Sequence, residues 1–188
     1  LGVLAGLCVL VGVALGCREP MSTYRAATGV LVRLADPSPR SSLDPLRAAP
    51  FEESELVLSL ATGVTRARLY VPAGAPAAPG LVLSHGVHRL GIDEPRLVSF
   101  ARALAGVGVV VLTPELAELA DYRIDPGSIA TIQAAAGFLS RQPSVRSGGV
   151  GVMGFSFAGG LSVLAAVGGE RAASIRYVVD VGGHHDLA

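Results

Sequence analysis

The sequence predicts an α/β fold: a mostly parallel sheet with helices on both faces. Four short and almost uniformly apolar runs carry this prediction, at 81–84, 108–113, 149–153 and 177–181. Such runs are typical of parallel strands that are buried on both faces. Helix-like segments separate them, and alternating strands and helices produce a parallel sheet. The 188 residues, 51% of them hydrophobic, suffice for one domain with a core.

The N-terminal segment is apolar from residue 1 to residue 16 and becomes polar at Arg18. As a helix it would be roughly 24 Å long, which is short for a hydrocarbon core of about 30 Å. An apolar run that ends in small residues is typical of a secretory signal. We therefore expect residues 1–17 to be a signal or anchor segment, and the protein to be exported.

Residues 14–17, Ala-Leu-Gly-Cys, resemble a bacterial lipoprotein box. This resemblance implies lipidation of Cys17 and a place in the bacterial cell envelope, either periplasmic or on the outer surface. A single-pass membrane anchor is the alternative. Because Cys8 lies within the apolar run, a processed chain would keep Cys17 alone and have no internal disulfide.

A short helix and a linker are predicted between the anchor and the folded domain, over residues 18–50. The helix is expected over 21–34, and 36–50 is rich in proline and serine, as linkers are. The domain then extends over 51–188 and starts with two antiparallel strands, 55–60 and 64–71. In the second strand apolar and other residues alternate, so it is predicted to be half-buried: Ala67, Leu69 and Val71 against Arg66, Arg68 and Tyr70.

Two amphipathic helices are predicted between the first three parallel strands. The first has an apolar stripe with helical spacing: Leu97, Phe100, Ala101, Leu104 and Ala105. The second starts with Asp125 as N-cap and Pro126 at the first helical position. Its stripe is Ile129, Ile132, Ala136 and Leu139.

The glycine-rich stretch at 149–160 contains the pattern of a dinucleotide-binding loop, but its context excludes that function. Such a loop follows a strand and opens a helix. Here Gly149 precedes the apolar run and Gly151 lies inside it. The acidic residue that would bind the ribose is expected about 20 positions on, and neither Glu170 nor Asp180 is well placed. Nucleic-acid binding is equally unsupported, since basic and acidic residues balance at 15 each.

The same stretch predicts a sharp strand–turn–helix elbow that exposes a serine. A strand ends at Met153, and Gly154-Phe155-Ser156-Phe157-Ala158-Gly159-Gly160 leads into a helical segment at 161–167. Such a turn strains the serine and crowds its neighbours, so the flanking residues must be small. The serine hydroxyl then lies at a helix N-terminus, where developing negative charge is stabilised.

This elbow resembles that of the α/β-hydrolase family, above all its dienelactone-hydrolase-like and esterase-like members, and the resemblance covers roughly 55–188. It implies Ser156 as nucleophile, with Gly154 and Gly159 as the small residues of the elbow. Where the family has glycine two positions after the nucleophile, this sequence has Ala158. His85-Gly86, after the first parallel strand, matches the family's oxyanion loop. The backbone N–H groups of Val87 and Phe157 would then bind the oxyanion, without a cofactor or a metal.

The general base and its carboxylate are not assigned by the resemblance. In the family both follow the nucleophile along the chain, with the acid first and the histidine last. His184 and His185 follow the last predicted strand, and Asp180 and Asp186 are candidate acids. The family order favours an acid and a base beyond Ala188, with the C-terminal part of the domain missing, and makes His85, His184, His185 and Asp186 pocket residues.

The function that the sequence predicts is a serine hydrolase that cleaves an ester or a related acyl bond of a small molecule. The membrane is the other expected partner, through the N-terminal segment or a lipid anchor. The alternative is a non-catalytic, membrane-tethered binding protein of hydrolase-like fold, which Ala158 and the unassigned base would favour.

Overall fold

The computed structural model describes residues 18–35, 49–60, 63–74 and 77–183. Six strands, five α-helices and two 3₁₀-helices are found in this part of the chain. In chain order they are α2 (Arg18–Ala35), β1 (Phe51–Leu60), β2 (Gly63–Pro72), β3 (Gly80–Ser84), η2 (Gly91–Asp93), α3 (Pro95–Gly106), β4 (Val110–Pro114), α4 (Ala117–Ala120), α5 (Gly127–Ser140), β5 (Val150–Phe155), α6 (Phe157–Ala166), η3 (Gly169–Ser174) and β6 (Ile175–Val181).

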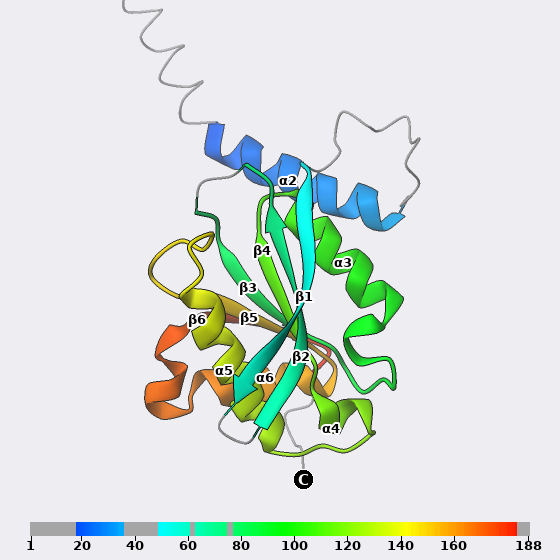
Figure 1. Cartoon of the computed structure of the whole chain (residues 1–188). Coiled ribbons are helices and arrows are strands. Elements are labelled where there is room, and N and C mark those ends of the chain that lie inside the picture. Colours follow the sequence, from blue (N-terminus) through cyan, green and yellow to red (C-terminus); the bar gives the residue numbers. More distant parts are fainter. Residues whose placement is uncertain (1–17, 36–48, 61–62, 75–76, 184–188) are drawn as a thin grey trace, which may run out of the picture.

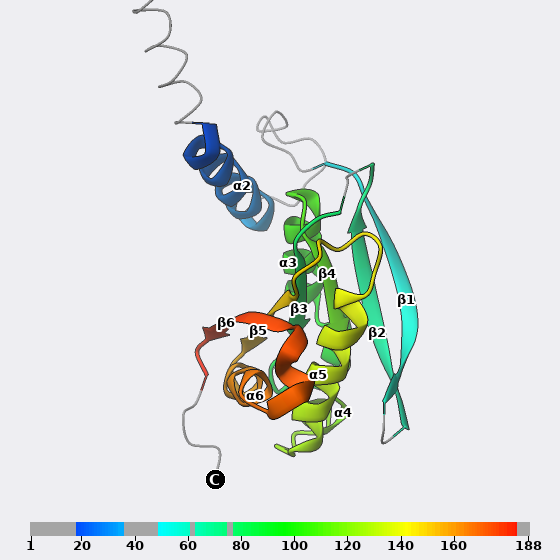
Figure 2. The ribbon, with the colours of Figure 1, turned by 90° about the vertical axis from the view of Figure 1, so that its left-hand side faces the viewer.

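The strands form one sheet in the order β1-β2-β4-β3-β5-β6. Strands β1 and β2 pair antiparallel with each other, and β2 pairs antiparallel with β4. The remaining pairs, β4 with β3, β3 with β5 and β5 with β6, are parallel. Helices α5 and α6 cover one face and α3 covers the other (Figures 1 and 2). The predicted fold class is therefore confirmed.

The core consists of two apolar clusters, one on each face of the sheet. Val82, Leu112 and Val152 point toward α5 and α6, whereas Leu83 and Val111 point toward α3. Successive residues of a strand face opposite sides, so the uniformly apolar runs of β3 and β4 fill both clusters.

Strand β2 differs from the half-buried strand that its alternating pattern predicts. The side chain of Tyr70 is fully buried in the cluster under α3, and its ring lies 6.4 Å from that of Phe51. Arg68 on the same face is largely buried and ion-paired with Glu55 at 2.8 Å and with Asp93 at 2.6 Å. Helix α3 packs over this face, and Phe51 of the neighbouring strand β1 packs beside Tyr70, so this face of β2 is covered as well.

Strand β6, by contrast, is less buried than its sequence predicts. Its apolar sequence predicts burial on both faces, but Tyr177, Val179 and Val181 are exposed. Among the described residues β6 pairs with β5 alone, and α6 packs against one of its faces, where Val178 contacts the core.

The helices lie close to their predicted positions, with shifted ends. Helix α5 begins one residue later than predicted, because Pro126 is its N-cap while the Asp125 carboxylate accepts the Gly127 N–H at 2.7 Å. Helix α6 begins at Phe157, four residues earlier than predicted, so the turn is tighter than the stretch 154–160 and only Ser156 lies between strand and helix. No helix within the described ranges is both long and apolar enough to cross a membrane.

Candidate active site

Ser156 lies at the C-terminal end of β5, between the strand and the first residue of α6. Its backbone has φ 54° and ψ −132°, a conformation that is close to glycine-only and costs about 1–3 kcal/mol. The Ser156 N–H donates to the Val181 carbonyl at 2.9 Å, and the Ser156 carbonyl accepts the Gly159 N–H at 2.8 Å. Contacts to β6 and to α6 therefore hold the strained turn in place.

Small residues around Ser156 let α6 cross β5 at close range. A Cβ atom on Gly154 would collide with the backbone of Ala158, and one on Gly159 would collide with the Asp180 carboxylate. Ala158, which departs from the family pattern, has its methyl group fully buried in the core cluster under α6. The elbow thus accommodates alanine at this position.

The loop after β3 lies against the elbow. Ser84, the last residue of β3, is in register with Gly154 of β5, so His85-Gly86-Val87 leave the sheet beside Ser156. A Cβ atom on Gly86 would lie 3.2 Å from the Phe155 carbonyl oxygen and 3.4 Å from Ser156 Cβ. The structure therefore brings the two motifs that the sequence singled out into direct contact.

His85 is 2% exposed and lies beneath this loop. Its Nδ1 is 2.8 Å from the Gly86 carbonyl oxygen, and its Nε2 accepts the Leu116 N–H at 3.0 Å. Both ring nitrogens are thereby engaged with the backbone, so His85 braces the loop.

Glu115 completes this buried group, although nothing in the sequence pattern singled it out. Its carboxylate lies 3.4 Å from His85 Nε2 and accepts the Ile92 N–H at 3.3 Å. Burial acts to raise the pKa of Glu115, but the His85 ring, the Ile92 N–H and the charge of Arg66 outweigh it and hold this pKa below its usual range. The one sequence signal for this role was the position of Glu115 as an acidic residue directly after the strand 110–114.

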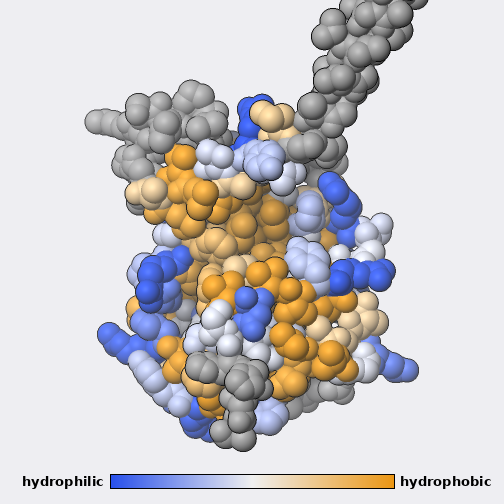
Figure 3. Space-filling view, turned by 180° about the vertical axis from the view of Figure 1, so that it is seen from behind, coloured by the Kyte–Doolittle hydropathy of each residue, from blue (hydrophilic) through white to orange (hydrophobic). Residues whose placement is uncertain are grey.

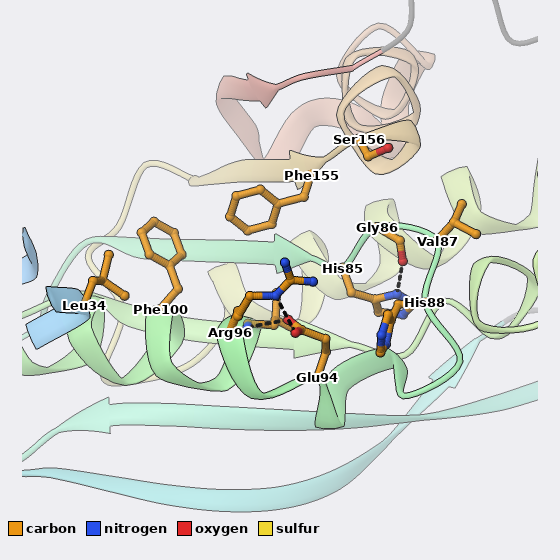
Figure 4. Close-up of a pocket in the computed structure, with 11 residues that line it drawn as sticks. Leu34, His85, Gly86, Val87, His88, Glu94, Arg96, Phe100, Phe155 and Ser156 are labelled. Carbon is orange, nitrogen blue, oxygen red and sulfur yellow. Dashed lines mark hydrogen bonds and ion pairs between the residues drawn. The ribbon is translucent and has the colours of Figure 1, made fainter. Parts of the chain in front are cut away.

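A cavity of about 550 Å³ extends from Ser156 along α3 to α2 (Figure 4). Most of its lining is apolar, and the Phe100 and Phe155 rings meet edge to face with centroids 5.6 Å apart. Polar groups are supplied by His88 and by the ion pair of Arg96 with Glu94 at 2.7 Å. Seen from behind, this side of the molecule shows a broad apolar surface below α2 (Figure 3). The cavity can hold an apolar group next to the serine hydroxyl.

The remaining predicted site residues are distributed as follows. Val87 lines the cavity and Phe157 opens α6. Asp180, on β6 in register with Gly154, accepts the Gly183 N–H at 2.8 Å. Cys17, His184, His185 and Asp186 lie outside the described residues. In the part of the chain that the structure describes, no three His, Cys, Asp or Glu side chains gather as metal ligands would.

Comparison with known proteins shows likeness in structure. The chain is similar to a hyperthermophilic esterase from the archaeon Pyrobaculum calidifontis, with a TM-score of 0.63, 19% identity, and coverage of 88% of this chain and 51% of the esterase. A dienelactone hydrolase from Anabaena variabilis gives a TM-score of 0.60, 27% identity, and coverage of 73% and 66%. For brefeldin A esterase, a bacterial homologue of human hormone sensitive lipase, the TM-score is 0.61, the identity 22% and the coverage 85% and 47%.

The chain thus spans about half the length of these two esterases and about two thirds of the dienelactone hydrolase. No protein-family model and no curated protein sequence matches it.

Proposed function

We propose that this chain, which has the α/β-hydrolase fold, is a serine hydrolase that cleaves an ester or a related acyl bond. One observation carries the proposal: Ser156 adopts a strained backbone conformation at the start of α6, in contact with the Gly86 loop and at the end of an apolar cavity. Strain of this kind is retained at functional sites because the surrounding structure enforces it.

In the proposed reaction the Ser156 hydroxyl attacks the acyl carbon, and negative charge develops on the carbonyl oxygen. The N–H groups of Val87 and Phe157, together with the N-terminal dipole of α6, would stabilise that charge. The contact of Gly86 with the Ser156 turn supports this assignment, because it keeps Val87 beside the elbow. The brace of His85 and Glu115 supports it further by fixing the loop from below.

The cavity suggests the kind of substrate. Leu34, Leu97, Phe100 and Phe155 offer an apolar surface along its length, so the acyl or alcohol part of the ester would be apolar. The dienelactone hydrolase and the esterases, all with this fold, make an ester-type small molecule the natural substrate class.

Serine needs a base to accept its proton. His85 is committed to backbone groups, so we assign the base to a residue outside the described ranges. Within the sequence His184 and His185 are the candidate bases, and Asp180 and Asp186 are the candidate acids. The family order favours residues beyond Ala188.

We also propose that the protein is exported and tethered to a membrane by residues 1–17. The apolar run and the Ala-Leu-Gly-Cys sequence ending at Cys17 support this. Metabolic labelling with a radioactive fatty acid tests the lipid form of the tether. Incorporation that is lost in Cys17→Ala supports it, and incorporation that persists in this variant contradicts it.

Labelling of the full-length protein with a fluorophosphonate tests the catalytic proposal. Label is expected on Ser156 and should be lost in Ser156→Ala. The matched control is Ser162→Ala, which removes a buried hydroxyl from the same helix α6 and should leave labelling unchanged. A folded full-length protein that takes up no label at Ser156 would favour the non-catalytic binding protein.

A further inference from the structure

Helix α2 packs on the domain through one face only. Gly29 is buried, and Ala26, Val30 and Arg33 on the same side are half-buried. The Arg33 guanidinium donates to the Arg102 carbonyl at 3.2 Å and lies 5.7 Å from the centre of the Phe51 ring. These contacts with α3 and β1 set the orientation of α2 on the domain (Figure 1).

The opposite face of α2 is apolar and exposed. Met21, Tyr24 and Leu31 are 57%, 70% and 67% exposed, and Thr28 and Ala35 lie between and after them on the same face. The spacing of three and four residues makes this one continuous stripe along the helix, and none of its five residues carries a charge. We refer to these five residues as the α2 stripe.

We propose that the α2 stripe lies on a lipid membrane, with α2 parallel to the surface. A helix with one apolar exposed stripe binds at the boundary between headgroups and acyl chains. Tyr24 suits this boundary, because its ring is apolar and its hydroxyl is polar. Arg25, exposed beside the stripe, would meet the anionic headgroups there.

The place of α2 in the chain selects lipid over other partners. The helix begins at Arg18, directly after the apolar segment and Cys17. Either form of the tether, a lipid on Cys17 or the apolar segment itself, would end one residue before α2. Such a short connection gives the helix a very high effective concentration at the membrane. This inference rests on the proposed tether, and the experiment below reads the tether and the α2 stripe separately.

The proposed orientation has a consequence for the cavity. Leu34, in the last turn of α2, lines the same cavity as Ser156 (Figure 4). A membrane-bound α2 would therefore hold one end of the cavity beside the lipid surface, where apolar esters accumulate.

A single tryptophan tests the proposal, because the chain contains none. We would place it at position 24 by Tyr24→Trp in the full chain, and add vesicles of phosphatidylethanolamine and phosphatidylglycerol with brominated acyl chains. The expected result is a shift of the emission to shorter wavelength, together with quenching by bromine. The matched control is Val64→Trp, a 72% exposed position on β2, which should show neither effect.

A second substitution tests the stripe itself. In the Tyr24→Trp background, Leu31→Glu should reduce the quenching at saturating lipid, because the tether keeps the chain on the vesicle while the equilibrium of α2 between lipid and water shifts about tenfold toward water. Val64→Glu in the same background is the control and should leave quenching unchanged. Both changed side chains are exposed, and circular dichroism reports whether the fold is kept.

Three results would overturn the proposal. If the chain sediments with the vesicles while the tryptophan at position 24 stays unquenched, the tether exists but the stripe does not touch lipid. If the emission shifts on concentrating the protein without vesicles, a second copy covers the stripe. If the chain neither sediments nor shows quenching, the tether and the proposed orientation both fail. Fluorophosphonate labelling of Ser156 does not depend on any of these three results, so it tests the catalytic proposal separately.

Discussion

Strands β3 and β6 are both apolar and both pair with β5, yet they are buried to different extents. Strand β3 lies between β4 and β5 with helices over both faces, and all five of its residues are buried. In the described part of the chain β6 has a strand on one side only, and most of its residues are exposed. Apolar composition therefore predicts a strand, whereas its neighbours decide its burial. The Ser156 elbow lies between β3 and β6, at the end of β5.

The largest expected effect is the difference in stability between two side-chain truncations, one on β3 and one on β6. Leu83→Ala on β3 should lower the free energy of unfolding by about 3 kcal/mol, because it leaves a cavity in the core. Val179→Ala on β6 should cost less than about 1 kcal/mol, since that side chain is partly in water. Urea denaturation measures both. Equal losses would mean that the exposed face of β6 is covered in solution.

A pair of glycines on β5 gives the next largest effect. A methyl group at Gly154 meets the backbone of Ala158, which cannot move without displacing α6, so Gly154→Ala should cost about 2–3 kcal/mol. At Gly151 it meets the half-exposed ring of Tyr177, which can swing outward. Gly151→Ala should therefore cost less than about 1 kcal/mol.

Tyr177→Ala is the control for the second glycine. It should remove most of the cost of Gly151→Ala in a double-mutant cycle and leave the cost of Gly154→Ala unchanged. If Gly151→Ala proved as costly as Gly154→Ala, β6 would be held more rigidly than its exposure suggests.

Release of backbone strain at Ser156 should have a smaller effect of opposite sign. Ser156→Gly is expected to raise the free energy of unfolding by about 1 kcal/mol, because glycine adopts this backbone conformation at little cost. Ser156→Ala keeps the strain and should not stabilise. Ser162→Gly, inside α6, should destabilise by about 0.5–1 kcal/mol. Thermal denaturation distinguishes these outcomes, and destabilisation by Ser156→Gly would contradict the strain argument.

The smallest effect concerns pH and the contact of His85 with Glu115 under the loop after β3. Because the pKa of Glu115 is lowered in the folded chain, the unfolded chain binds more protons at mildly acidic pH. The stabilising contribution of Glu115 is then complete above its usual pKa of about 4.3 and declines as the pH falls through the lower folded value.

Comparison of the protein with Glu115→Gln measures this contribution. The difference in the free energy of unfolding should shrink between about pH 6 and about pH 3. A difference that stays constant over this range would show that the Glu115 charge does not stabilise the fold.

The contrast between local pattern and long-range packing also separates the features of the site that the sequence predicted from those that it did not. The elbow was predictable because Gly154 meets a local requirement for space at a turn, where the backbone of Ala158 approaches it. Glu115 was not, because its partners His85 and Ile92 come from a different segment of the chain. The presence of Leu34 in the cavity likewise depends on how α2 packs against α3. Roles that come from long-range packing leave little local pattern.

By itself, the sequence determined the order and type of the main strands and helices, the parallel sheet, and the close approach at Gly154 beside Ser156. These follow from periodicity and residue size, which act over a few neighbouring residues. Only the tertiary structure decided that Tyr70 is buried and that β6 is exposed. Burial depends on which elements pack across a surface, and contacts between segments far apart in the chain determine that packing.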